Sequence, residues 1–397
     1  MKILKLLFLV FWVIFCSISV YSQSKEEIDF YQSQLDSLIV NIRLNDSVAK
    51  YYKNIYKAEN FIMKCNYKKA AEYYEKAFKF IKYPFEKDLT NARICELCSR
   101  NNEENIKKYV WYSINKSGYK KGILNNDKYH LLSKWDEIKY MIDTMQSVIN
   151  KEISEYLEGI LYDDQEIRTQ ARESMEDYYH DSEWGKIIWN MDSINYYKIL
   201  NLIDEYENID EKIFEENWYN ISVILLHNPQ RLDLYIKLHD LVINGKLDAR
   251  KYIGNLEHSY YKVADKYSFG EESYGFIASP FDGPDNIINE ELYVYIIPTM
   301  KEKNTINKYR KKLYVEDVKL YHQKCKVQAH NKDLKFRFCA NEYVQFWNLD
   351  DYYNLILNKR SMNNKKVKIY YKDCVQKRKL KKEAKGYKKS HQKPLGV

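Results

Sequence analysis

Glycine, proline and cysteine are scarce in this sequence of 397 residues. It contains 11 Gly and 6 Pro, and so few helix-breaking residues over this length favour helices. It also contains 7 Cys, which is too few for a fold held together mainly by disulfide bonds. We therefore expect a mainly α protein whose stability comes from packed apolar helix faces.

Long apolar runs are also missing, except for one at the N-terminus. Lys2 and Lys5 precede an apolar run from about Leu6 to Cys16, and Val20 and Ser22 then lie three and one residues before Gln23. This is the pattern of a secretory signal peptide, which we assign to residues 1–22.

Two alternatives to a cleaved signal are a membrane anchor and a lipoprotein. The apolar run is shorter than the roughly 20 residues that a spanning helix needs. A lipoprotein would have a small residue before Cys16, where this chain has Phe15. We expect an exported protein, periplasmic or extracellular, with no transmembrane segment after signal removal.

Excess positive charge is concentrated at one end of the chain. The sequence has 64 Lys and Arg against 56 Asp and Glu, a net charge of +8. Residues 376–397 hold nine Lys or Arg and one Glu, which equals this whole excess. The rest of the chain is therefore close to neutral and predicts no basic groove for nucleic acid. We expect this tail to be disordered, with either no partner or a peripheral contact to anionic lipid or polymer.

The region 23–150 has the periodicity of helical hairpins. A helix is expected from about Ser47 to Lys64, followed by the stretch CNYKKAAEYYEKAFKFIKYP, residues 65–84, which we expect to be helical until Pro84 stops it. The second helix of a looser hairpin is expected before Gly118. The first hairpin resembles a tetratricopeptide repeat, and the matching positions are Tyr67, Ala70, Tyr74, Ala77 and Pro84. The alternative is a stack of helices without a binding partner.

The region 151–322 has a series of amphipathic segments. Ile153, Leu157, Ile160 and Leu161 are expected on one face of its first helix. Further helices are expected around Pro229 and Gly245, and the Gly- and Pro-rich residues 268–286 are expected to form a loop.

The order of polar motifs in this region resembles a bacterial family of unknown function. Its members have Asp-Gln-x-x-Arg, Asp-x-x-Asn, Gln-His-x-Asp, Asp-Arg and Tyr-Gly-Thr-Gln motifs. The positions that match define a candidate polar cluster of Asp164, Gln165, Arg168, Asp192, Asn195, His227 and Tyr274. The resemblance covers nearly half of the chain that follows the signal, and it implies no particular activity.

The same motifs are incomplete in this chain. Leu226 stands where the family has Gln, His258 and Ser259 stand where it has Asp-Arg, and Phe276 and Ile277 replace Thr-Gln. A site built from these positions would therefore be degenerate. His227 could act as a general base, bind a metal or interact with a helix end, and we favour the last.

No recognised catalytic motif is present. The sequence lacks a nucleophile elbow, a phosphate loop, a zinc-protease helix and a dinucleotide fingerprint. We accordingly assign no catalytic residue and no metal ligand, and the sequence leaves the cofactor open.

The region 323–375 changes to a period of two. Alternating residues predict strands over 333–340, 342–347 and 363–372, with a short helix through Leu357, in a small α+β module. We favour a protein- or envelope-binding scaffold as the function. The alternative is an enzyme or degenerate enzyme with its polar site around His227.

Overall fold

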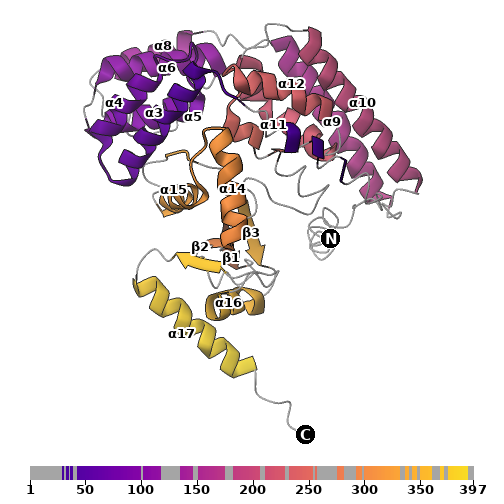
Figure 1. The fold of residues 1–397 in the computed structure, drawn as a ribbon. Helices are drawn as coiled ribbons and strands as arrows, with labels where there is room; N and C mark the ends of the chain where they lie inside the picture. The colour runs from indigo at the N-terminus through magenta and orange to yellow at the C-terminus, as the bar shows by residue number, and fades with distance from the viewer. Residues whose placement is uncertain are drawn as a thin grey trace. The chain divides into compact units, whose positions relative to one another are not determined.

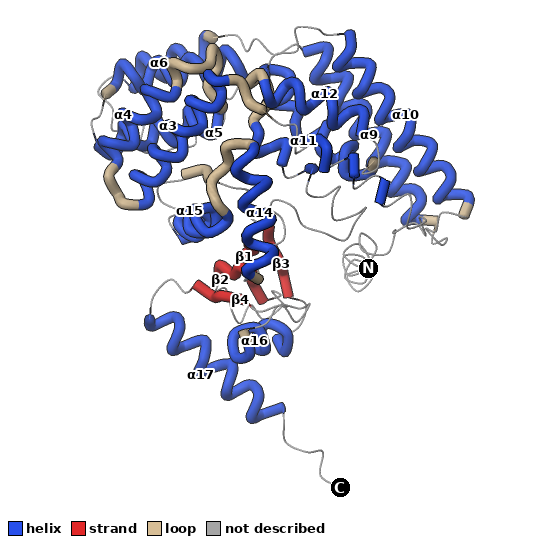
Figure 2. The backbone as a smooth tube through the Cα atoms, viewed as in Figure 1, coloured by secondary structure: helices blue, strands red, loops and turns tan. Residues whose placement is uncertain are grey.

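The fold is mainly helical, as the composition predicted (Figures 1 and 2). The computed structural model describes residues 29–30, 33–34, 36–38, 43–99, 102–117, 135–145, 151–174, 182–205, 211–228, 232–253, 255–256, 275–280, 292–296, 299–330, 336–338, 342–346, 349–359, 367–370 and 374–391. The chain forms two compact units. Unit 1 contains Met1–Asn45, Ile114–Lys120 and Met145–Tyr267, and unit 2 contains Asp46–Ser113, Lys121–Thr144 and Ser268–Val397.

This division differs from the predicted domains. Residues 46–113 belong to the same unit as the C-terminal part of the chain, and only the predicted boundary near residue 150 lies close to a change of unit. The predicted signal at 1–22 lies outside the described residues. Among the helices that are described, none combines the length and apolar character that crossing a membrane requires.

Unit 1 is a group of amphipathic helices. They are α9 (Lys151–Glu173), α10 (Glu183–Glu205), α11 (Glu211–His227) and α12 (Leu232–Ile243). Helix α9 packs against both α10 and α11. Ile153, Leu157 and Ile160 are buried on the predicted face of α9, whereas Leu161 is half-buried. The apolar face of α9 therefore fixes which of its polar residues meet the neighbouring helices.

Unit 2 begins with consecutive helices. They are α3 (Asp46–Met63), α4 (Tyr67–Ala77), α5 (Glu86–Ser99), α6 (Glu103–Ser117) and α8 (Trp135–Thr144). The last residues of α6, from Ile114 onward, are assigned to unit 1. Asn66 caps α4 by accepting a hydrogen bond from the backbone N–H of Lys69 at 3.2 Å.

The prediction that Pro84 ends the helix of residues 65–84 was wrong. Helix α4 already ends at Ala77, where the backbone N–H of Phe78 bonds back to the carbonyl of Tyr74 at 2.9 Å. Turns follow before Pro84, so local hydrogen bonding ends this helix before proline could.

Unit 2 also contains a sheet of four strands. These are β1 (Gly275–Pro280), β2 (Leu292–Ile296), β3 (Glu342–Phe346) and β4 (Val367–Tyr370), in the order β3-β1-β2-β4. β1 pairs antiparallel with β2 and parallel with β3, and β2 pairs antiparallel with β4.

This sheet differs from the predicted one at two places. Residues 275–280 form β1, although 268–286 was expected to be a loop, because a short Phe-Ile segment lies between Gly275 and Pro280 and pairs with strands far along the chain. The sheet also includes β1 and β2, which precede residue 323, where the α+β module was expected to begin.

The strand predicted at 333–340 is replaced, over 336–338, by a segment outside the sheet. Phe336 and Phe338 are buried, as the alternation predicted. However, the backbone of Arg337 exchanges two hydrogen bonds of 2.7 Å with the side chain of Asn91, on α5. The side-chain amide of Asn91 thus bonds the backbone N–H and carbonyl of Arg337, which the alternating pattern had predicted to bond to a neighbouring strand.

The described part of unit 2 contains four more helices. They are α14 (Met300–Lys312), α15 (Val318–His330), α16 (Leu349–Asn358) and α17 (Cys374–His391). The prediction of a disordered tail was wrong for the residues of α17. Leu380 and Ala384, one helical turn apart, are buried, and α17 packs against α16. These two apolar residues and the high helix propensity of Lys and Ala explain the difference.

Candidate functional site

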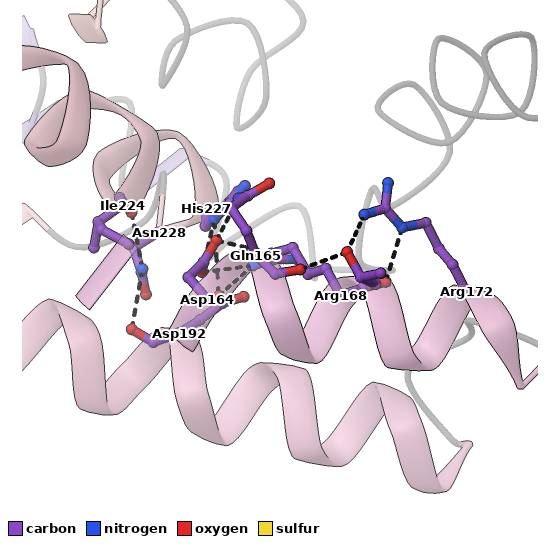
Figure 3. A network of polar contacts seen from close by, with 9 residues as sticks. Asp164, Gln165, Arg168, Arg172, Asp192, Ile224, His227 and Asn228 are labelled. Atoms are coloured by element: carbon purple, nitrogen blue, oxygen red, sulfur yellow. Dashed lines mark hydrogen bonds and ion pairs between the residues drawn. The ribbon is translucent and has the colours of Figure 1, made fainter. Parts of the chain in front are cut away.

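Four polar residues from three helices of unit 1 meet (Figure 3). Asp164 and Arg168 lie one turn apart on α9, so both side chains share a face of that helix. Asp192 comes from α10, and His227 is the last residue of α11. We call these four residues the site cluster.

Arg168 connects α9 to α10. Its Nε and one terminal nitrogen lie 3.3 and 3.4 Å from the two carboxylate oxygens of Asp164. The same terminal nitrogen also donates to Asp192 Oδ1. One guanidinium is therefore shared by two carboxylates, an arrangement that suits its planar set of donors.

His227 is oriented by a carboxylate. Its Nδ1 lies 3.2 Å from Asp164 Oδ1 and 3.9 Å from Asp192 Oδ1. The Asp164 side chain is 1% exposed, whereas that of His227 is 23% exposed. The buried carboxylate thus lies behind an imidazole that reaches solvent.

The two carboxylates have opposite pKa shifts. Burial acts to raise the pKa of Asp164, but the hydrogen bond and charge of His227 and the charge of Arg168 outweigh it and lower this pKa to about 2. Burial dominates at Asp192 and raises its pKa, although Arg168 and His227 partly oppose the shift. Paired acids with separated pKa values are a common feature of sites that transfer protons.

Gln165 also belongs to this arrangement. Its amide donates to Asp164 Oδ2 at 2.7 Å, so Asp164 is contacted by three side chains. Of the residues that the sequence predicted to lie together, the structure brings together Asp164, Arg168, Asp192 and His227.

Two predicted members of the polar cluster are not placed in it. Asn195 is fully buried on α10, and its side-chain amide has no hydrogen-bond partner among the described residues. Tyr274 lies outside the described residues, as do His258 and Ser259.

Asn228 is a supporting residue that the sequence analysis missed. Its side-chain amide donates to the backbone carbonyls of Asp192 at 3.2 Å and Ile224 at 3.0 Å (Figure 3). It therefore ties the end of α11 to α10 beside His227. An Asn directly after a helix end is a signal for such capping.

The site cluster also has the ligand types of a metal centre. One ligand atom from each of Asp164, Asp192 and His227 lies within 4.8 Å of the others. However, N–H donors of Arg168 and Gln165 already contact the carboxylate oxygens, and a cation would have to displace a guanidinium. The arrangement therefore fits an ion-pair and proton-transfer site better than a metal centre.

Comparisons with known proteins give no relative. No protein-family model, curated protein or solved structure matches this chain.

Proposed function

We propose that Asp164 and His227 form a general acid–base pair in an exported protein. The observation that carries this proposal is the contact between a buried carboxylate and a partly exposed imidazole. If Nδ1 donates its proton to Asp164, Nε2 becomes the acceptor on the more exposed side of the ring. The described residues make no hydrogen bond to Nε2.

The pair would act on a proton of a water molecule or a substrate hydroxyl. A positioned imidazole contributes roughly 10²- to 10⁴-fold to such reactions. Arg168, 18% exposed, brings positive charge beside the imidazole, where it would favour substrates that develop negative charge. The active chemistry would then be proton transfer rather than attack by a protein nucleophile.

The resemblance noted in the sequence supports this proposal. Asp164, Asp192 and His227 come from three separate motifs of that family, and their side chains lie close together. The departures at Leu226, His258, Ser259, Phe276 and Ile277 favour a weak or degenerate enzyme over an efficient one.

Chemical modification and activity together test the acid–base pair. Diethyl pyrocarbonate should acylate His227 in the native protein, while the buried His239 and His322 should be protected. A panel of ester, amide and phosphoester substrates should then reveal an activity that His227→Gln removes. Asp204→Asn, which changes an exposed carboxylate of the same unit, is the control. A protected His227, or an activity unchanged in His227→Gln, would refute the proposal.

Export and the repeat character of α3–α6 are part of the same proposal. The N-terminal pattern supports cleavage before Gln23, and N-terminal sequencing of the exported protein tests it. The helix pairs α3–α4 and α5–α6 have the order expected of tetratricopeptide-like hairpins.

A protein- or envelope-binding scaffold is the second candidate. Ile187, Ile194 and Tyr197 lie on one side of α10 and are 40%, 42% and 48% exposed. If these residues bind a partner protein, Ile187→Asp with Ile194→Asp should abolish capture of that defined partner. His227→Gln should retain it, which separates the scaffold from the acid–base site.

A further inference from the structure

Almost all of the excess positive charge of the chain lies on one helix. Helix α17 contains eight Lys or Arg residues and one acid, Glu383, which gives +7. Subtracting these from the whole sequence leaves 56 basic and 55 acidic residues elsewhere, a balance of +1. The charge of this protein is thus a local property of α17.

The charges of α17 are arranged on one side. Arg378, Lys382 and Lys385 are exposed and lie four and three residues apart, so they form a stripe along one helix face. Leu380 and Ala384 are fully buried on the opposite side. We call the three exposed residues the basic stripe.

The acidic residue of α17 does not interrupt this stripe. Glu383 is half-buried, and its Oε2 is buried without a hydrogen-bond partner among the described residues. It therefore belongs toward the packed side of the helix. The basic stripe faces solvent without an acid of its own helix beside it.

The apolar side of α17 is already used within unit 2, where the helix packs against α16. An amphipathic helix that enters a bilayer buries its own apolar face among the acyl chains. Leu380 and Ala384 are not available for that. Any attachment through α17 must therefore use charge at a surface.

We propose that the basic stripe docks the protein on the anionic headgroups of a lipid bilayer. Seven of the eight basic residues of α17 are Lys, whose compact charges suit a diffuse anionic surface more than bidentate recognition of one phosphate. A helix with α16 behind it also fits a plane better than the DNA major groove, which is about 12 Å wide.

Vesicle sedimentation with the full mature chain tests this proposal. Binding is expected to vesicles of phosphatidylcholine with phosphatidylglycerol, and not to vesicles of phosphatidylcholine alone. It should disappear near 1 M salt, where the Debye length is about 3 Å. Replacing Arg378, Lys382 and Lys385 together by Gln should weaken binding on the order of 100-fold.

A charge-matched variant controls for net charge. Lys301, Lys308 and Lys311 are three exposed lysines of α14 in the same unit, and replacing all three by Gln should have little effect on vesicle binding. Circular dichroism melting of both triple variants should match the parent, because every changed residue is exposed.

Three results would overturn the proposal. One is no binding to anionic vesicles at low salt, and another is an equal loss in the α14 triple variant. The third is binding of a DNA fragment, lost in the α17 variant, without vesicle binding, which would assign the stripe to a polyanionic polymer.

Discussion

The site cluster of unit 1 and a second charged cluster in unit 2 contain similar groups in different surroundings. In unit 2, Lys324 Nζ lies 2.9 Å from Glu316 Oε1 and also pairs with Glu59, and Arg310 lies 4.0 Å from Glu316. We call these four residues the core charge cluster. Each cluster contains two carboxylates, but all four side chains of the core cluster are 5% exposed or less.

Charge balance separates the two clusters. The core charge cluster has two acids and two permanent cations, which neutralise each other in the interior. The site cluster has two acids and one permanent cation, Arg168, and its remaining charge depends on the protonation of His227. A buried cluster in which positive and negative charges are equal in number is suited to a structural role. A partly exposed cluster with unequal numbers of acids and permanent cations is suited to binding or catalysis.

The largest expected effect is the removal of Lys324. Lys324→Met should destabilise the protein by about 5 kcal/mol, because it leaves Glu59 and Glu316 buried without their shared cation. Urea unfolding at neutral pH measures the loss. Lys237→Met breaks an exposed pair with Asp204 and should cost about 0.5 kcal/mol.

A double variant sharpens this prediction. Lys324→Met combined with Glu59→Leu removes one charge of each sign and leaves Glu316 with Arg310. It should be less destabilised than Lys324→Met alone. Equal stability of the single and double variants would show that packing, and not charge balance, holds this cluster together.

The next effect is acid sensitivity centred on His322, which lies beside the core charge cluster. Burial and the positive charge of Arg310 lower the pKa of His322 to about 3. The unfolded chain therefore binds a proton below pH 6.5 that the folded chain does not. Stability should fall by on the order of 4 kcal/mol as the pH drops from 6.5 to about 3.

His322→Gln should flatten the acid limb of the stability curve. Measured by urea unfolding at a series of pH values, the variant and the parent should converge toward acid. Glu316 adds to the same trend in both proteins. Its pKa is about 2, because Lys324 and Arg310 outweigh burial, so its contribution is lost from pH 4.5 down to about 2. Parallel curves for the two proteins would contradict the assignment to His322.

The sequence predicted the site cluster better than the core charge cluster. Asp164 and Arg168 are one turn apart on a predicted helix, and Asp192 and His227 fall in recurring motifs, so local pattern and resemblance pointed to them. Lys324 and Glu59 are 265 residues apart. The hydrophobic periodicity of the sequence cannot predict such a pair, because the pair forms only when α15 packs against α3.

The errors in the predicted fold have the same physical origin. Helix α3 follows from local periodicity, and it was predicted from about Ser47 to Lys64 and is observed at Asp46–Met63. Strand β1 depends on partners at 292–296 and 342–346, and the segment 336–338 depends on Asn91. Hydrogen bonds to residues far along the chain determine the conformation of these segments, and a local sequence pattern gives no information about such bonds.

Within the site cluster, the two carboxylates should respond differently to neutralisation. The folded pKa of Asp164, about 2, is below its ordinary 3.8, so its charge stabilises the fold above pH 3.8 and this contribution is lost as the pH falls toward 2. Asp164→Asn should therefore cost about 2 kcal/mol at pH 7. The cost should shrink in urea unfolding experiments near pH 2.

Asp192→Asn should be close to neutral or stabilising. Its raised pKa means that the folded state disfavours its charge, so its contribution falls as the pH rises through 3.8. Arg168 also retains Asp164 in this variant. A variant that gains stability while losing activity would be typical of a functional site. A larger loss for Asp192→Asn than for Asp164→Asn would reverse our interpretation.

A small loss of stability is expected at His227. His227→Ala removes the 3.2 Å contact with Asp164 and should cost about 1 kcal/mol, since one partly exposed hydrogen bond is lost. Asp164 keeps its contacts with Arg168 and Gln165, so no buried carboxylate is left alone. Urea unfolding and the substrate panel should be measured on the same sample. If the residue is functional, activity should fall by at least 10²-fold while stability changes little. A stability loss as large as that of Lys324→Met, with activity retained, would make His227 a structural residue and remove the distinction between the two clusters.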